Sequence, residues 1–430
     1  MNKIIFRLLV LQVTFLLDQT AQVYAQDFAY KDSVYVDYIK SVKFNIAGNP
    51  LALPAVPLGS EFPLELSFDD MDTHTREYTV SIIHCNKDWT PSQEINELEY
   101  LSGFNNAPIR DISISFNTVV NYMHYYMSLP NSEIGWKITG NYLLKVTDRD
   151  DDDKVLITRR FVVFQPLMTI VPAVTRTAEV SKSTTHQELD FEVQHKSFVI
   201  RSPRTELTAT ILQNKRWDTA IKDLIPVFIR SEGEVFDYQD KIVFEAGKEF
   251  RFFDMRGMHI LGENVENARQ VTNGYEVHLR KDRINTNVSY LYRKDLNGDF
   301  VVDCYDIDVN DCQTRGDYGN VYFTLKSDTE LEGKDVYITG AISDWQIKPQ
   351  FKMEYNESRG QYEAQILLKQ GYYNYQYTTV DRKTGRQDDN ELQGNWYETE
   401  NSFTIILYYR GFGERYDQVL GYGVFDSRKY

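Results

Sequence analysis

The sequence of 430 residues is poor in cysteine, proline, glycine and long apolar runs. It contains only 3 cysteines, 12 prolines and 23 glycines. So few cysteines exclude a disulfide-rich scaffold, and so little proline and glycine excludes a collagen-like or largely disordered chain. Beyond the N-terminal region, no segment approaches the roughly 18 consecutive apolar residues of a transmembrane helix. The fold must therefore rest on packed apolar cores.

The sequence also has no surplus of positive charge. It has 47 Lys and Arg residues against 63 Asp and Glu residues, a formal net charge of -16. This balance argues against a nucleic-acid-binding protein, because phosphates need a basic surface. A Gly-rich phosphate loop, a His–Glu zinc spacing and a nucleophile elbow are all missing, so the sequence predicts no catalytic residue and no cofactor. An enzyme that uses paired carboxylates leaves no local signature and is kept as a third-ranked alternative.

Aromatic residues, by contrast, are plentiful: 30 Tyr and 24 Phe. They favour strands over helices. Apolar and polar residues alternate with a period of two along much of the chain, as in Ile112, Ile114 and Phe116 or in Tyr373, Tyr375 and Tyr377. This alternation is typical of antiparallel sheets with one buried face. The predicted fold class is all-β, built of tandem immunoglobulin-like β-sandwich domains.

Helical signals are scarce in the sequence. The best candidate follows Thr90, where Pro91 and Gln93 resemble a helix start, although an ordered loop fits equally well. An outer-membrane β-barrel is the alternative to the sandwiches. Short strands and charges that interrupt both strand faces, as at 279–283, argue against the barrel.

Residues 1–25 have the pattern of a Sec signal peptide. Lys3 and Arg7 precede an apolar run at 8–17, and Ala25 occupies the cleavage position. We therefore expect an exported mature chain that begins at Gln26. No cysteine follows the apolar run, so a lipoprotein is not expected.

Two changes in composition predict three β-domains after the signal peptide. The first lies around 165–172, where an apolar run gives way to two prolines, and the second lies at 303–320, where the chain is polar and rich in Asp and Gly. The predicted pieces, each of ordinary β-sandwich size, are 1–25 (signal peptide), 26–166, 167–318 and 319–430.

Three motifs invite a chemical interpretation beside a structural one. His84 and Cys85 are adjacent on a predicted strand and therefore point to opposite faces, which argues against a thiol–base pair. Four aspartates at 150–153 are interpreted as a solvated hairpin tip between strands 142–147 and 155–164.

The third motif resembles the start of a calcium loop. It has oxygen-bearing side chains at alternate positions, but Phe300 stands where the loop needs glycine and Asp306 replaces the closing glutamate. An acidic hairpin turn is the preferred interpretation, and calcium is a weak candidate at Asp295, Asn297 and Asp299.

Cys304 and Cys312 are the one close pair of cysteines, so they could form a single disulfide or stay as free buried thiols.

The C-terminal piece carries a series of aromatic and glycine motifs at 336–340, 344–345, 360–363 and 371–377. Their order resembles the early-set immunoglobulin-like modules, including the glycogen-binding type. In such modules aromatic rings can stack on sugars, and Trp345 and Trp396 are the candidates here, although tryptophans in sandwiches also close cores. The alternative function is therefore a periplasmic or surface glycan-binding β-sandwich protein.

The N-terminal piece carries a dense set of motifs, among them His84-Cys85 and Asp88-Trp89. The set comprises residues 48–51, 57–59, 66–70, 83–86, 88–92, 99–104, 115–118, 129–132 and 140–146. It is similar to the first domain of the type IX secretion system plug protein family of Bacteroidetes, formerly a domain of unknown function.

The resemblance implies a non-enzymatic periplasmic protein, peripheral to the outer membrane and without membrane insertion of its own. Its implied partner is the outer-membrane translocon β-barrel, whose pore the family's plug closes when no cargo is engaged. The resemblance brings no catalytic residues and no cofactor. Residues 421–430 do not resemble the sorting domain of exported cargo, which favours a component of the machine.

Overall fold

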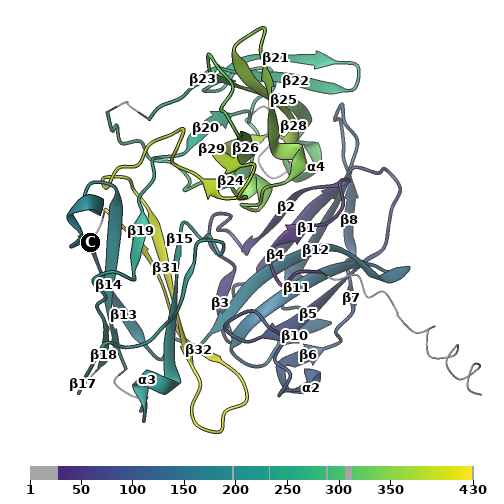
Figure 1. Ribbon diagram of the computed structural model, residues 1–430. Coiled ribbons are helices and arrows are strands. Elements are labelled where there is room, and N and C mark those ends of the chain that lie inside the picture. Colours follow the sequence, from purple (N-terminus) through teal and green to yellow (C-terminus); the bar gives the residue numbers. More distant parts are fainter. Residues whose placement is uncertain (1–27, 196–197, 232, 287–288, 306–311, 429–430) are drawn as a thin grey trace, which may run out of the picture.

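The computed structural model describes residues 28–428 except 196–197, 232, 287–288 and 306–311 (Figure 1). The predicted signal peptide lies outside the described residues. Strands account for 49% of the residues and helices for 5%, which confirms the all-β prediction. In the described part of the chain, no helix is both long and apolar enough to cross a membrane.

The N-terminal unit is a sandwich of two antiparallel sheets. One sheet runs β1 (Ser33–Val34), β12 (Asp151–Phe164), β11 (Gly140–Asp148), β5 (Tyr78–Cys85) and β7 (Ala107–Pro108), with β3 (Ala55–Pro57) parallel to β12. The facing sheet runs β2 (Ile39–Ile46), β4 (Leu64–Asp70), β9 (Met123–Leu129) and β8 (Asp111–Ile114). Apolar side chains from both sheets form one core between them, among them Leu66, Tyr125, Tyr142 and Leu144.

A short extension closes one end of this sandwich. It contains α2 (Glu97–Tyr100) and the pair β6 (Leu101–Gly103) and β10 (Ile134–Trp136). The chain after Thr90 is a loop, and the helix begins six residues later than its expected first residue, Pro91. The reason is local: Asn96 and Glu99 form the capping box that starts α2, whereas Pro91 pairs with Cys85 in an isolated bridge.

The middle unit is a second sandwich. Its first sheet runs β13 (Thr169–Arg176), β14 (His186–Gln194), β18 (Gly233–Phe236) and β17 (Phe228–Arg230), with β19 (Val243–Glu245) beside β14. Its second sheet runs β16 (Ile221–Leu224), β15 (Leu207–Gln213), β31 (Ser402–Tyr409) and β32 (Gln418–Asp426). The short helices η1 (Val180–Lys182) and α3 (Pro203–Glu206) belong to its connections.

The third unit is organised around one long, strongly curved sheet. Its order is β20 (Arg251–Asp254), β29 (Gly371–Asp381), β26 (Lys334–Thr339), β27 (Lys352–Asn356), β28 (Gln361–Lys369), β25 (Tyr318–Lys326), β22 (Gly274–Leu279) and β21 (Val265–Val271). Short strands flank it: β23 (Asp282–Arg283), β24 (Phe300–Val302) and β30 (Gln387–Asp388). The helices are α4 (Cys312–Arg315), η3 (Ala341–Ser343) and η4 (Pro349–Phe351). As the alternation in the sequence predicts, Tyr373, Tyr375 and Tyr377 of β29 are buried in the core.

The sheets divide the chain differently from the expected pieces 167–318 and 319–430. β31 and β32 lie in the last of these pieces, yet β31 pairs with β15 of the middle unit, and β32 pairs with β31 at the edge of the same sheet. The middle unit is therefore assembled from two separate stretches of chain, and the third unit is inserted between them (Figure 1). Between the first two units the connection is short, since β12 ends at Phe164 and β13 begins at Thr169.

The N-terminal unit packs on both of the others. Against the middle unit it shares an apolar core that includes Trp89 and Val162 from one side and Trp217 and Ile406 from the other. Against the third unit it shares a buried ion pair between Asp69 and Lys369, whose atoms lie 2.6 Å apart and whose side chains are each 1% exposed. Units that share a core and a buried charge pair hold a fixed relative position.

The charge of Asp69 is stabilised from several elements. His124 Nδ1 lies 2.6 Å from one of its oxygens, and the Tyr318 hydroxyl donates to the other at 2.7 Å. Burial by itself would raise the pKa of Asp69, but Lys369 and His124 outweigh it and hold the pKa below its usual value. The carboxylate is thus kept ionised inside the junction.

Candidate functional site

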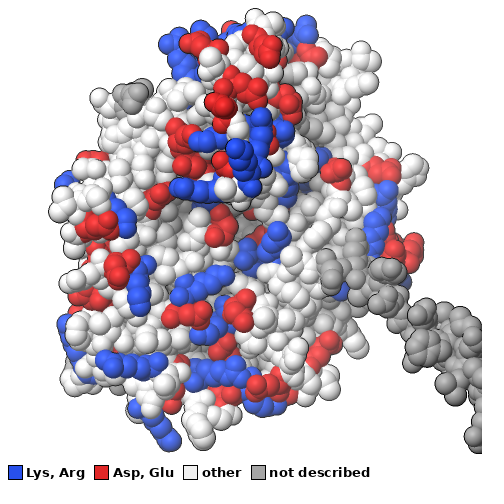
Figure 2. All heavy atoms as spheres, in the orientation of Figure 1, with Lys and Arg blue, Asp and Glu red and all other residues white. Residues whose placement is uncertain are grey.

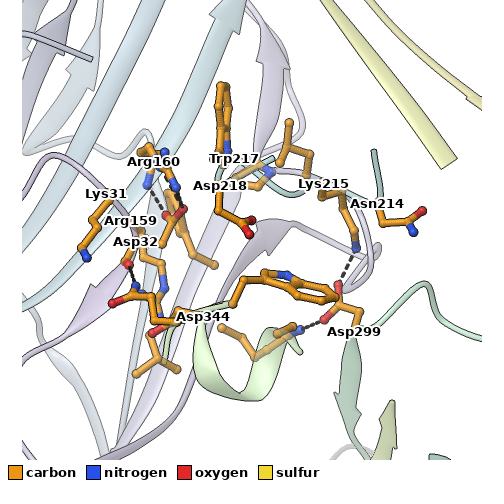
Figure 3. A pocket seen from close by; sticks show the side chains of 18 of the residues that line it. Lys31, Asp32, Arg159, Arg160, Asn214, Lys215, Trp217, Asp218, Asp299 and Asp344 are labelled. Carbon is orange, nitrogen blue, oxygen red and sulfur yellow. Dashed lines mark hydrogen bonds and ion pairs between the residues drawn. The ribbon is translucent and has the colours of Figure 1, made fainter. Parts of the chain in front are cut away.

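The three units meet around a cleft of about 620 Å³ (Figure 3). Charged side chains from every unit line it. The N-terminal unit supplies Lys43 and Arg159, the middle unit supplies Lys215, and the third unit supplies Asp299 and Asp344. This is the point where segments that are distant in sequence converge, so we take it as the candidate site.

Asp299 ties all three units together. One carboxylate oxygen accepts from Lys43 Nζ at 3.0 Å, and the other accepts from Lys215 Nζ. Lys215 also donates to the carbonyl of Leu51 at 2.7 Å, and Lys43 donates to the carbonyl of Phe300 at 2.9 Å. Burial alone would raise the pKa of Asp299, but the two lysines lower it to about 2. The carboxylate is therefore ionised, and each of its oxygens is paired with a lysine.

A second group of ion pairs lies on the other side of the cleft. Asp344, the residue after η3, contacts Arg159 at 3.2 Å and Lys348 at 2.8 Å. Although burial opposes it, these cations hold the pKa of Asp344 below its usual value. Asp32 pairs with Arg160 at 2.8 Å, and its carbonyl accepts from Gln346 Nε2 at 2.5 Å. The N-terminal and third units are thus held together a second time.

Aromatic rings cover these cations. The Arg160 guanidinium lies 5.0 Å from the centre of the Trp217 ring and 5.3 Å from that of Trp89, and the two indoles meet edge to face at 4.8 Å. A guanidinium that lies between aromatic rings and a carboxylate is partly desolvated, and its contacts restrict its motion. The cleft is therefore a stiff, mostly ion-paired junction. Nothing in its described lining forms a nucleophile–base pair.

The calcium-loop residues lie on a tight turn before β24, and two of them, Asn297 and Asp299, line the cleft. Asp295 accepts the backbone N–H groups of Phe250 at 2.6 Å and Asn297 at 2.7 Å, and burial raises its pKa to about 7. Asp299 points instead to the lysines of the cleft. Asp306 lies outside the described residues. Among the residues that the structure describes, no group of three or more His, Cys, Asp or Glu could hold a metal ion.

The three cysteines separate into a pair and a single thiol. Cys304 and Cys312 form a disulfide with their Cα atoms 5.6 Å apart. Cys85 is free and buried, and burial raises its pKa to about 12. His84 faces the opposite side, where its Nδ1 lies 2.8 Å from Ser92 Oγ, so the two residues do not form a catalytic pair.

The tryptophans proposed for sugar stacking are both half-buried, and only Trp345 lines the central cleft. The Arg216 guanidinium lies 4.4 Å from the centre of the Trp345 ring, and Lys248 Nζ lies 4.8 Å from that of Trp396. A protein cation therefore already occupies one face of each ring. Of the acidic run at 150–153, only Asp150 lies in the turn between β11, which ends at Asp148, and β12, which begins at Asp151; the second strand therefore starts earlier than the expected residue 155.

Sequence reasoning missed the residues that build the cleft, above all Lys43, Lys215 and Arg159. Lys43 and Asp299 are 256 positions apart, and Lys43 sits in no recognisable motif. One signal was available: Asn297-Gly298 predicts a tight turn, and both residues have positive φ, 52° and 80°. That turn is what aims Asp299 into the cleft.

The fold and the cleft define a class of protein: tandem β-sandwiches locked to one another by buried ion pairs. Residues 39–165 match the family model described as type 9 secretion system plug protein 1st domain. The chain is also 33% identical to a hypothetical protein from Parabacteroides merdae ATCC 43184, whose 2.30 Å crystal structure superimposes with a TM-score of 0.87. That similarity covers 93% of this chain and 100% of the other. Among curated proteins, none matches. Residues 39–165 therefore form a first domain of the type 9 secretion system plug protein family.

Proposed function

We propose that this protein is a non-enzymatic periplasmic plug, which closes the pore of the type IX secretion outer-membrane translocon when no cargo is engaged. The observation that carries the proposal is the family match over residues 39–165, the first domain of the plug protein. In this proposal the N-terminal 25 residues direct export, and the mature chain works at the periplasmic mouth of the barrel.

The packing of the three units is consistent with such a role. A stopper has to keep its shape when the partner or a solute presses on it. Here the N-terminal unit shares an apolar core with the middle unit and two sets of ion pairs with the third. Bending one unit away from the others would break a core or leave a buried charge unpaired, which costs several kcal/mol.

The surface charge is consistent with reversible closure. Positive and negative side chains are interspersed over the face shown in Figure 2. Interfaces that must open again are generally more polar than obligate ones, which resemble a domain core. The chain also needs no catalytic group for this role, because blocking a pore depends on shape and affinity alone.

Affinity purification tests the proposal. The full-length chain with a C-terminal tag is expressed in its native host, the envelope is extracted gently, and co-purified proteins are identified by mass spectrometry. We expect the type IX translocon barrel to be recovered, and an unrelated exported β-sandwich with the same tag not to recover it. Recovery of no outer-membrane protein with the tagged chain would overturn the proposal.

A further inference from the structure

Three large apolar side chains project into solvent at one end of the molecule. Leu98 and Phe104 are each 80% exposed and Phe412 is 103% exposed. Leu98 lies in α2, Phe104 directly follows β6, and Phe412 is at the tip of the loop 410–417 between β31 and β32. Figure 1 shows α2, β6 and this yellow loop together at the lower end of the molecule. We refer to Leu98, Phe104 and Phe412 as the α2-end surface.

The two segments that carry this surface are far apart in the sequence but are joined by ion pairs and a hydrogen bond. Arg415 pairs with Glu99 and donates to the carbonyl of Glu94 at 3.2 Å. Arg410 pairs with Glu94 at 3.2 Å. Beneath them, Tyr416 packs edge to face on His84, with ring centres 5.3 Å apart. The loop is thus fixed to α2.

The backbone that presents each apolar side chain is braced as well. Within the loop, Arg410 donates to the carbonyls of Glu414 at 3.3 Å and Arg415 at 3.1 Å. Lys137 Nζ donates to the carbonyl of Leu98 at 3.1 Å, and the N–H of Phe104 donates to the carbonyl of Glu133 at 2.7 Å. A loop that is already held in place loses little conformational entropy on binding, so a preformed surface binds its partner more tightly. Phe104 and Phe412 are moreover so exposed that they add little to the core of their own unit.

The charges around the surface indicate what covers it. Loops that insert into anionic lipid carry free basic side chains beside their apolar tips. Here Arg410 and Arg415 are already paired with glutamates, Glu97 and Glu414 are exposed nearby, and the whole chain carries -16. An anionic membrane is therefore repelled. A protein with apolar pockets bordered by basic side chains is complementary to this surface.

We propose that the α2-end surface is the part of the plug that docks on the translocon, into apolar pockets bordered by Lys or Arg on the periplasmic rim of the barrel. The inference rests on the proposed function and adds the contact surface to it. Phe412 is the central anchor, because it is completely exposed and stands on a loop that is fixed at both sides.

The test uses the full-length tagged chain and the same purification. The variants are Phe412→Asp and the double change Leu98→Asp with Phe104→Asp. The matched controls are Val180→Asp and Ile260→Asp, because these apolar residues are 87% and 68% exposed on other parts of the protein. We expect each α2-end variant to lower the captured barrel by about tenfold or more, and each control to capture as much as wild type. Unchanged unfolding midpoints establish that the variants are folded.

The outcomes separate this inference from the proposed function. If wild type captures the barrel and both α2-end variants capture equal amounts, the docking surface is wrong and the plug function stands. If wild type captures no barrel, both fail. Flotation of wild type with phosphatidylethanolamine–phosphatidylglycerol vesicles, lost in Phe412→Asp, would identify lipid as the occupant and overturn the inference. A wild-type dimer that Phe412→Asp converts to monomer in sedimentation would also overturn it, in favour of a second copy of the chain.

Discussion

His84 shows how a residue that suggests catalysis serves packing instead. It is 1% exposed and surrounded by the rings of Tyr100, Tyr142 and Tyr416, with ring centres 4.9–5.7 Å away. Burial lowers its pKa to about 4, against 6.5 in a free chain. The imidazole is therefore neutral at pH 7 and acts as a polar aromatic of the core. Its neighbour Cys85, on the other face, is an inert buried thiol.

This burial predicts acid sensitivity near neutral pH. Between pH 6.5 and 4 the unfolded chain binds a proton at His84 that the folded protein does not, so the free energy of unfolding falls as the pH is lowered. The expected loss from His84 over this range is about 3 kcal/mol. Urea unfolding of His84→Gln at pH 7 and pH 4 should show a pH dependence smaller by that amount. The exposed His259→Gln should keep the wild-type dependence, and an equally steep loss in His84→Gln would contradict the account.

At the scale of elements, the alternation of apolar and polar residues predicted a strand correctly where the apolar side chains of that strand are buried. The tyrosines of β29 are buried as the alternation indicated, and β11 and β12 form the predicted hairpin, although β12 already begins within the acidic run. β8 departs from the pattern. Ile114, at the end of this edge strand, is 62% exposed, and Phe116, which follows the strand, is 68% exposed, whereas Ile112 packs against the core. Alternation shows which residues share a face, but the covering layer comes from elsewhere in the chain.

The turn at Asn297 and Gly298 is the element on which the cleft depends most. Gly298 has φ of 80°, and a Cβ atom there would lie 2.3 Å from Cη2 of Trp345 and 2.9 Å from Cε1 of Phe250. The glycine therefore serves both the backbone and the packing of the indole. A side chain would displace Trp345 or the turn, and with the turn Asp299.

Substituting two glycines separates these effects. Gly298→Ala should lower the free energy of unfolding by about 3 kcal/mol or more, because strained backbone and steric overlap add. Gly333→Ala is the matched control, since its φ of 69° is similar and no heavy atom lies within 4 Å of the added Cβ. It should cost about 1 kcal/mol, the backbone term alone. Equal losses in urea unfolding would show that the Trp345 contact carries no energy.

At the scale of the whole molecule, the grouping of strands into sheets does not follow the order of the chain, and the sequence did not indicate this. A local motif reports only on the unit that contains it, whereas paired residues of β15 and β31 are 190 to 202 positions apart in the chain. Strand pairing at that separation leaves no local pattern. The cleft escaped prediction for the same reason, because Lys43, Lys215 and Asp299 become neighbours only when three units have docked. The proposed function rests on the family resemblance, because the residues alone did not indicate a function.

The discontinuous middle unit predicts that the C-terminal strands are essential for it. A chain that ends at residue 398 lacks β31 and β32. The core of its middle unit therefore lacks Leu407 and Leu420. In hydrogen–deuterium exchange, the amides of β14 and β15 should lose most of their protection. Those of β4 and β9, in the N-terminal unit, should stay far better protected. A chain that lacks only residues 429–430 is the control, and unchanged protection of β15 in the shorter chain would contradict this assembly.

Closure of a pore is the role that we propose for this protein, and a conductance measurement tests it most directly. The type IX translocon barrel, purified without this protein, is inserted into a planar lipid bilayer, and its open-pore current is recorded before and after the full-length chain is added on the periplasmic side. The account predicts that the current falls to near the level of the bare bilayer and that Val180→Asp protein blocks equally well. A current that stays unchanged while the chain is bound to the barrel would contradict it.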